Sequence, residues 1–114
     1  MESYSSTIVY KAAHLKKTTV HHWMNRLGIL SDVCRVGTGR AIKFSTANVI
    51  FLILFNSMQY IDCKTRIYIC RLATDNFIAA NMDIDRFTCT VGDGVEISIT
   101  MNKLINPVLA RLNS

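Results

Sequence analysis

A short amphipathic segment, a basic stretch containing two glycines and a strongly apolar segment follow one another in the first half of this 114-residue chain. The amphipathic segment spans residues 19–27, and Gly28, which follows it, is expected as the helix C-cap. Its apolar side chains recur at i, i+3, i+4 and i+7, the spacing of one helical face; they are Val20, Trp23, Met24 and Leu27. The opposite face is polar and carries His21, His22, Asn25 and Arg26. The pattern predicts a helix that packs by one side only.

The basic stretch, residues 31–44, predicts a β-hairpin. Residues that favour extended structure stand on both sides of a Gly37-Thr38-Gly39-Arg40 turn, and glycine supplies the positive φ that such turns need. Arg35, Arg40 and Lys43 give this hairpin its positive charge. The apolar segment that follows predicts a buried helix, capped by Ser45 and running to about Tyr60.

A short helix is expected before the amphipathic one. Residues 8–15 place Val9, Ala12 and Ala13 on one face, and Thr18 offers an N-cap for the helix that begins at Thr19.

The second half predicts helix, hairpin and helix. A helix is expected from about 65 to 80. Apolar residues alternate over 86–91 and 95–100 on both sides of Gly92-Asp93-Gly94, a strong hairpin signal. A last helix is expected over 102–112, with Pro107 inside it or at its restart. The fold class predicted is α+β.

The positive charge is unevenly distributed. The chain carries a net charge of +5. The first 44 residues hold seven Lys and Arg against two Asp and Glu, whereas the remaining 70 hold six of each. Such asymmetry is typical of a nucleic-acid-reading half joined to a neutral assembly half.

The order of these elements resembles the winged helix-turn-helix domains of the MerR family and their excisionase-like relatives. The resemblance covers about residues 8–58, or half the chain. It rests on Tyr10 to Ala13 at the first helix, Thr19-Val20-His21-His22-Trp23 at the recognition helix, and Gly28-Ile29-Leu30 at the family's "G-L-L". Gly39-Arg40, Phe44-Ser45 and Asn48-Val49 match its "G-x-R-x-Y-S-x-x-D-V". Three features depart from the family pattern: no turn glycine stands near His14 or Leu15, His21 replaces a frequent arginine, and one extra residue precedes Gly28.

The resemblance implies a recognition helix in the major groove and a wing on the neighbouring backbone or minor groove. Phosphates would be neutralised by Lys16, Lys17, Arg35 and Lys43. Base edges would be read by His21, His22, Asn25 and Arg26, since asparagine suits adenine and arginine suits guanine. The wing turn adds Thr38 and Arg40, and Arg40 suits a narrow minor groove. Thr18 and Thr19 are expected as caps whose hydroxyls also reach a phosphate.

The expected organisation is a DNA-binding domain over residues 1–60 and a dimerisation extension over 61–114. Half of the residues are hydrophobic, and mean hydropathy is +0.24, more apolar side chain than a short chain buries easily. A homodimer through residues 86–112 is therefore expected. No secretory signal is visible at the N-terminus, and the apolar run at 49–55 is too short to span a membrane, so a cytoplasmic protein without membrane contact is expected.

No motif indicates an enzyme, a cofactor or a metal. The four cysteines form no C-x-x-C pair, the spacing that a structural zinc site needs, and are expected as small buried hydrophobes. Asp83 and Asp85 lack a base or metal partner in the sequence.

The function expected is sequence-specific regulation of transcription by a homodimer on a palindromic or repeated double-stranded DNA site, with a phage or mobile element as the source. Two alternatives stay open. One is an excisionase-like factor that bends DNA during recombination. The other is a protein-interaction module that does not bind DNA.

Overall fold

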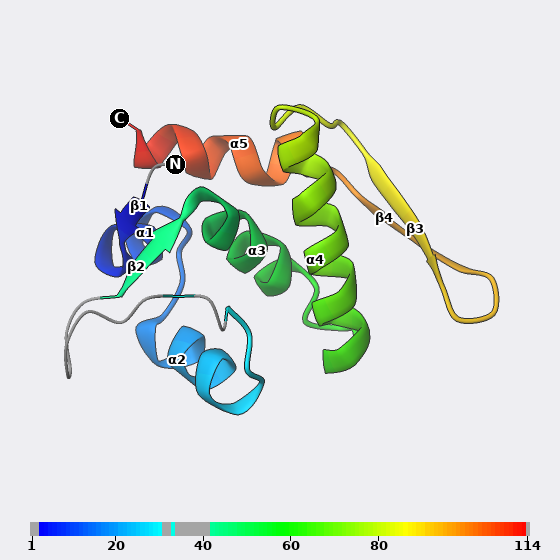
Figure 1. Cartoon of the computed structure of the whole chain (residues 1–114), viewed down its shortest axis with the longest axis horizontal. Helices are drawn as coiled ribbons and strands as arrows, with labels where there is room; N and C mark the ends of the chain where they lie inside the picture. Colours follow the sequence, from blue (N-terminus) through cyan, green and yellow to red (C-terminus); the bar gives the residue numbers. More distant parts are fainter. Residues whose placement is uncertain (1–2, 31–32, 34–41, 114) are drawn as a thin grey trace. The chain divides into compact units, whose positions relative to one another are not determined.

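The structure is a computed structural model that describes residues 3–30, 33 and 42–113. Its described part contains five helices and two two-stranded antiparallel sheets, which confirms the α+β class (Figure 1). The elements are β1 (Ser3–Ser5), α1 (Ser6–Ala12), α2 (Lys17–Arg26), β2 (Lys43–Ser45), α3 (Thr46–Ser57), α4 (Cys63–Ala79), β3 (Phe87–Val91), β4 (Val95–Ile99) and α5 (Met101–Leu112).

The chain divides into two compact units. The N-terminal unit comprises residues 1–49 together with 108–114, and the central unit comprises residues 50–107. Helices α3 and α5 each supply residues to both units. The expected boundary near residue 60 stays a prediction.

In the N-terminal unit, the segment before α1 pairs with the segment before α3. Strands β1 and β2 are antiparallel, with Ser3 opposite Ser45 and Ser5 opposite Lys43 (Figure 1). The Ser6 amide extends the pairing by donating to the Ile42 carbonyl at 2.8 Å. The pattern at 42–44 was read as extended, which is confirmed, but β1 as its partner was not predicted. The remainder of the expected hairpin, residues 34–41, lies outside the described residues.

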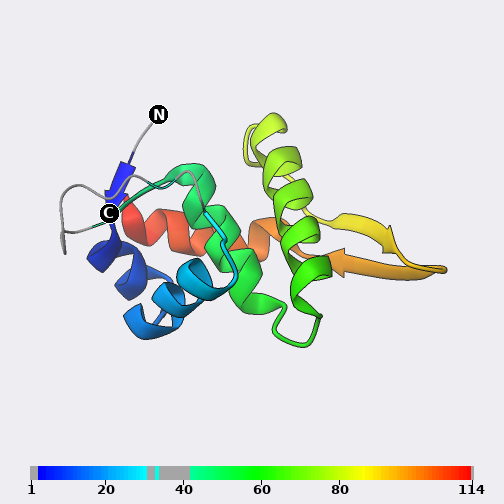
Figure 2. The ribbon, with the colours of Figure 1, turned by 60° about the horizontal axis from the view of Figure 1, so that its bottom comes forward.

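Helices α1 and α2 follow one another through a tight turn (Figure 2). Helix α1 begins at Ser6, two residues before the predicted start. The turn closes with a bond from the Leu15 amide to the Tyr10 carbonyl at 2.8 Å. His14 takes φ +55° there, the left-handed conformation for which glycine is the usual residue. The missing turn glycine is thus replaced by a strained histidine, and the turn is retained.

The predicted Ser45 cap is confirmed, and it is reciprocal. The Ser45 hydroxyl accepts from the Asn48 amide at 3.2 Å, and the Asn48 side chain accepts from the Ser45 amide at 2.9 Å. These bonds satisfy backbone donors that a helix start leaves unpaired. Helix α3 ends at Ser57, three residues before the predicted end. Every residue from Asn48 to Phe55 is buried, as its apolar circumference predicted.

The final turns of α5 belong to the N-terminal unit. The Arg111 Nε donates to the Ala12 carbonyl at 2.8 Å, and the Tyr4 hydroxyl donates to the Asn113 side chain at 3.3 Å. Val108, in these turns of α5, is 6% exposed. This end of α5 therefore already packs within its own chain.

In the central unit, α4 is anchored to the end of α3 by a buried arginine. Helix α4 starts at Cys63, two residues before the prediction, because the Asp62 side chain accepts from the Thr65 amide at 3.2 Å. Hydrogen bonds from the backbone and the side chain of Thr65 lower the pKa of Asp62. The Arg66 Nε donates to the Phe55 carbonyl at 2.8 Å, and its guanidinium lies 3.7 Å from the centroid of the Phe55 ring. Burial lowers the pKa of Arg66.

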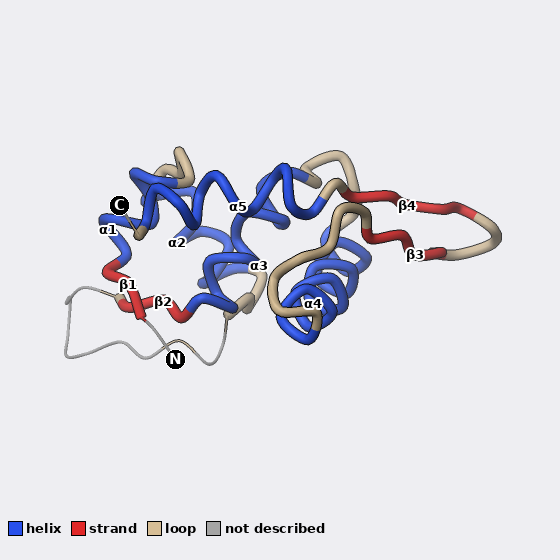
Figure 3. Tube along the Cα trace, turned by 90° about the horizontal axis from the view of Figure 1, so that it is seen from above, coloured by secondary structure: helices blue, strands red, loops and turns tan. Residues whose placement is uncertain are grey.

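The second hairpin is confirmed in both strands and in its turn (Figure 3). Phe87 faces Ile99 and Val91 faces Val95, with Gly92 at φ +59° and Gly94 at φ +85°. Helix α5 begins at Met101 and runs through Pro107 without ending.

Asn102, at the start of α5, ties that helix to the segment that leads into the hairpin. The Asn102 amide donates to Asp83 and to Asp85, both at 2.9 Å, and its oxygen accepts from the Ile84 amide at 3.0 Å. The two carboxylates that the sequence left without a role are therefore structural acceptors in the central unit.

Candidate nucleic-acid interface

Helix α2 is amphipathic as predicted. Val20 is fully buried and Trp23 is 7% exposed, so both anchor the helix. Three exposed side chains lie at i, i+4 and i+7 on the opposite side, and a fourth exposed side chain lies four residues after the second. We call these four the recognition face: Thr18, His22, Asn25 and Arg26.

His21 lies at the edge of this face. It is half-buried, and its ring packs edge-on against Tyr10, with 6.5 Å between the ring centroids. Tyr10 in turn packs edge-on against Phe44, at 6.0 Å. His21 thus belongs partly to the packing between α1 and α2, whereas His22 points to solvent. The role of His21 as a base reader stays a prediction.

The N-terminus of α2 is basic. Lys16 occupies the N-cap and Lys17 the first helical position, both exposed, and the first turn holds no acidic residue. A helix N-terminus carries partial positive charge, so two lysines there oppose the helix dipole instead of complementing it. The same arrangement favours an anion such as a phosphate.

Thr18 and Thr19 are not caps, and that expectation is wrong. The N-cap is Lys16, which makes no side-chain cap bond, and the helix is already formed at Thr18. Because α2 starts two residues early, the Thr18 side chain turns onto the recognition face, while Thr19 is half-buried. The i, i+4, i+7 spacing of Thr18, His22 and Asn25 was the sequence signal for this.

The remaining predicted residues divide into two groups. Lys43 is exposed on β2, opposite Ser5. Arg35, Thr38 and Arg40 lie outside the described residues. Within the N-terminal unit, the predicted residues on α2 thus share one helix, and Lys43 lies on β2, the next described element along the chain.

The charge asymmetry follows the division into units. The N-terminal unit holds eight Lys and Arg against two Asp and Glu, a net charge of +6. The central unit holds five against six, a net charge of −1. The positive charge therefore belongs to the unit that contains α2.

The cysteines differ in their surroundings. Cys70 is buried, and burial raises the pKa of its thiol to about 12. Cys89 is half-buried, which raises the pKa of its thiol as well. Cys63 is exposed, so the prediction that it is buried is wrong. Cys34 lies outside the described residues.

Among residues 3–30 and 42–113, no group of three or more metal-ligating side chains gathers in one place. No helix in these ranges is long and apolar enough to cross a membrane. No protein-family model matches the sequence, and no curated protein is significantly similar to it.

Proposed function

We propose that this protein binds double-stranded DNA in a sequence-specific manner through α2 and thereby regulates transcription. The observation that carries the proposal is the recognition face: four exposed polar side chains on a helix whose other side is anchored by Val20 and Trp23. Asparagine and arginine on such a face match the donor and acceptor patterns of adenine and guanine in the major groove.

The surroundings of α2 support this proposal. Lys16 and Lys17 stand at its N-terminus, where backbone amides and positive charge suit a phosphate. The unit has a net charge of +6, which supplies the non-specific part of DNA affinity. The order strand, helix, tight turn, helix, strand, helix agrees with the MerR-like resemblance, in which the segment between α2 and β2 is the wing.

Footprinting on the DNA that flanks the gene for this protein, at two salt concentrations, tests the proposal. We expect a protected site whose occupancy falls steeply with salt, because phosphate contacts release counterions. One site beside a promoter supports regulation of transcription. Tandem sites with marked bending support the excisionase-like alternative. No protection at low salt contradicts DNA binding and favours the interaction module.

A further inference from the structure

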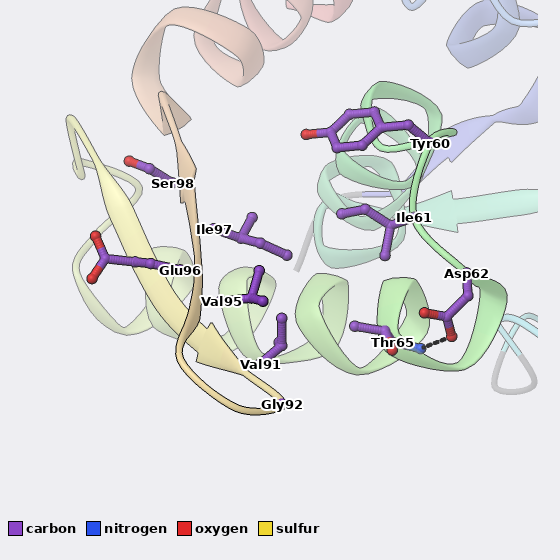
Figure 4. Close-up of a pocket in the computed structure, with 10 residues that line it drawn as sticks. All are labelled: Tyr60, Ile61, Asp62, Thr65, Val91, Gly92, Val95, Glu96, Ile97 and Ser98. Carbon is purple, nitrogen blue, oxygen red and sulfur yellow. Dashed lines mark hydrogen bonds between the residues drawn. The ribbon is translucent and has the colours of Figure 1, made fainter.

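The central unit has an open apolar groove between its hairpin and the start of α4 (Figure 4). On the hairpin side, Val91, Val95 and Ile97 point toward Ile61 and Thr65 across a hollow of about 610 Å³. A second hollow of about 340 Å³ adjoins it along α4, reaching Tyr68. The two hollows share Thr65, Val91 and Gly92 in their linings and thus lie next to each other; we call them together the groove.

Large apolar side chains stand exposed along this groove. Tyr60 is 81% exposed, Tyr68 59% and Val95 58%. They are three of the five large hydrophobic side chains that stand exposed among the described residues. The adjoining sheet has only two strands, an arrangement that is marginal unless something packs against it. Both facts indicate a surface that is completed by a protein partner.

The two elements that border the groove, α4 and the hairpin, carry exposed side chains of opposite charge. Helix α4 presents Lys64, Tyr68 and Arg71 at i, i+4 and i+7, all exposed, which we call the basic stripe. The hairpin presents Asp93 in its turn and Glu96 on β4, where the side chain points away from the groove (Figure 4). Within the part of the chain that the structure describes, no ion pair involves these charges.

We propose that the partner is a second copy of this chain. The acidic hairpin of each copy lies on the basic stripe of the other, and Val95 and Tyr68 fill the apolar centre. A two-fold interface needs a self-complementary surface, because every contact occurs twice. The central unit carries both the acidic hairpin and the basic stripe, so the same surface on two copies is complementary in charge.

The net charges of the two units also favour a second copy that docks through the central units. Two central units, each with a net charge of −1, repel weakly, whereas two N-terminal units of +6 repel strongly. The inference does not depend on DNA binding, since its test contains no DNA.

Charge reversal in two separate variants tests the proposal by sedimentation of the full chain. One variant, K64E/R71E, makes the stripe acidic. The other, D93K/E96K, makes the hairpin basic. We expect each alone to raise the dimer dissociation constant about tenfold or more, because like charges then face each other twice. K103E serves as control: it alters an exposed charge of the same unit that does not line the groove, and it should leave dimerisation unchanged.

Mixing the two variants is the decisive step. In a mixed dimer, the acidic stripe meets the basic hairpin and the unchanged stripe meets the unchanged hairpin, so both contacts are attractive. We expect the mixture to recover the wild-type dissociation constant within about threefold. A wild-type chain that is monomeric at micromolar concentration overturns the proposal. So does a mixture that stays monomeric while circular dichroism shows both variants folded.

Discussion

Backbone strain at His14 shows how a single residue departs from the local sequence rule without changing the fold. A non-glycine side chain at φ +55° costs roughly 1–2 kcal/mol. The turn still forms, because the Ala13 and Leu15 amides bond to the carbonyls of Val9 and Tyr10. The packing of α1 and α2 thus outweighs a local preference that sequence reading weighs heavily.

His14→Gly should stabilise the protein. Glycine adopts the left-handed conformation without steric cost, and His14 is exposed, so little packing is lost. We expect the free energy of unfolding to rise by about 0.5–1 kcal/mol, measured by urea denaturation, since relief of strain exceeds the added entropy of the unfolded chain. His14→Ala keeps the strain and serves as control. An H14G variant that is less stable than wild type contradicts this account of the turn.

The thiols should react in an order set by burial. Burial raises the pKa of Cys70 to about 12, so almost no thiolate is present at pH 8, and the thiolate is the reactive form. Cys63 is exposed and should react with a maleimide within minutes in the folded protein. Peptide mapping by mass spectrometry should find Cys70 labelled only after denaturant is added. Rapid labelling of Cys70 in the native state contradicts its placement in the core.

At the scale of elements, periodicity was a reliable guide, whereas α1, α2 and α4 each begin two residues before their predicted starts. The apolar spacing of α2 and the alternation around Gly92 to Gly94 predicted a helix and a hairpin that the structure confirms. The α2 start was missed because Lys16, a residue with no capping group, occupies the N-cap. Strand β1 was missed because three polar residues pair only with β2, some forty residues later. Long-range pairing of this kind leaves no local pattern.

Lys17→Glu should separate the stability of α2 from its proposed function. A glutamate in the first turn complements the helix dipole, so the free energy of unfolding should rise by about 0.3–1 kcal/mol. DNA affinity should fall, because a phosphate contact is replaced by repulsion. Thermal denaturation and a binding titration on the footprinted DNA measure the two effects.

K103E provides the matched control for this charge reversal, because Lys103 is also exposed but lies in the central unit. It should leave DNA affinity close to wild type. Equal losses of affinity in K17E and K103E would show that net charge, rather than the position of Lys17, controls binding.

At the scale of the whole molecule, the two units divide the charge and the exposed apolar surface between them. The N-terminal unit is strongly basic and presents α2, and the central unit is nearly neutral and presents the groove. The charge asymmetry could be read from the sequence, whereas the dimer surface expected over residues 86–112 stays a prediction. The sequence could not predict that the last turns of α5 join the N-terminal unit, because Arg111 meets Ala12 from 99 residues away.

Burial within the chain limits the apolar surface that α5 can offer to a partner. A dimer surface was expected over residues 86–112, which include the apolar side of α5. Ile105 is fully buried and Val108 nearly so, while Leu104, Leu109 and Leu112 are half-buried. The surplus of apolar side chain is found instead at Tyr60, Tyr68 and Val95. Sequence periodicity cannot distinguish an apolar face that is buried within its chain from one that is buried by a partner.

The salt dependence of DNA affinity tests the central claim most directly, in the wild type, in K17A/R26A and in the charge-matched control R86A/K103A. Each double variant removes two exposed cations. K17A/R26A removes both from α2, and R86A/K103A removes both from the central unit. If α2 is the DNA-binding element, K17A/R26A should weaken binding by at least about tenfold and reduce the slope of log affinity against log salt by about one to two. The control should keep the wild-type slope. Identical slopes for all three proteins would contradict DNA binding through α2.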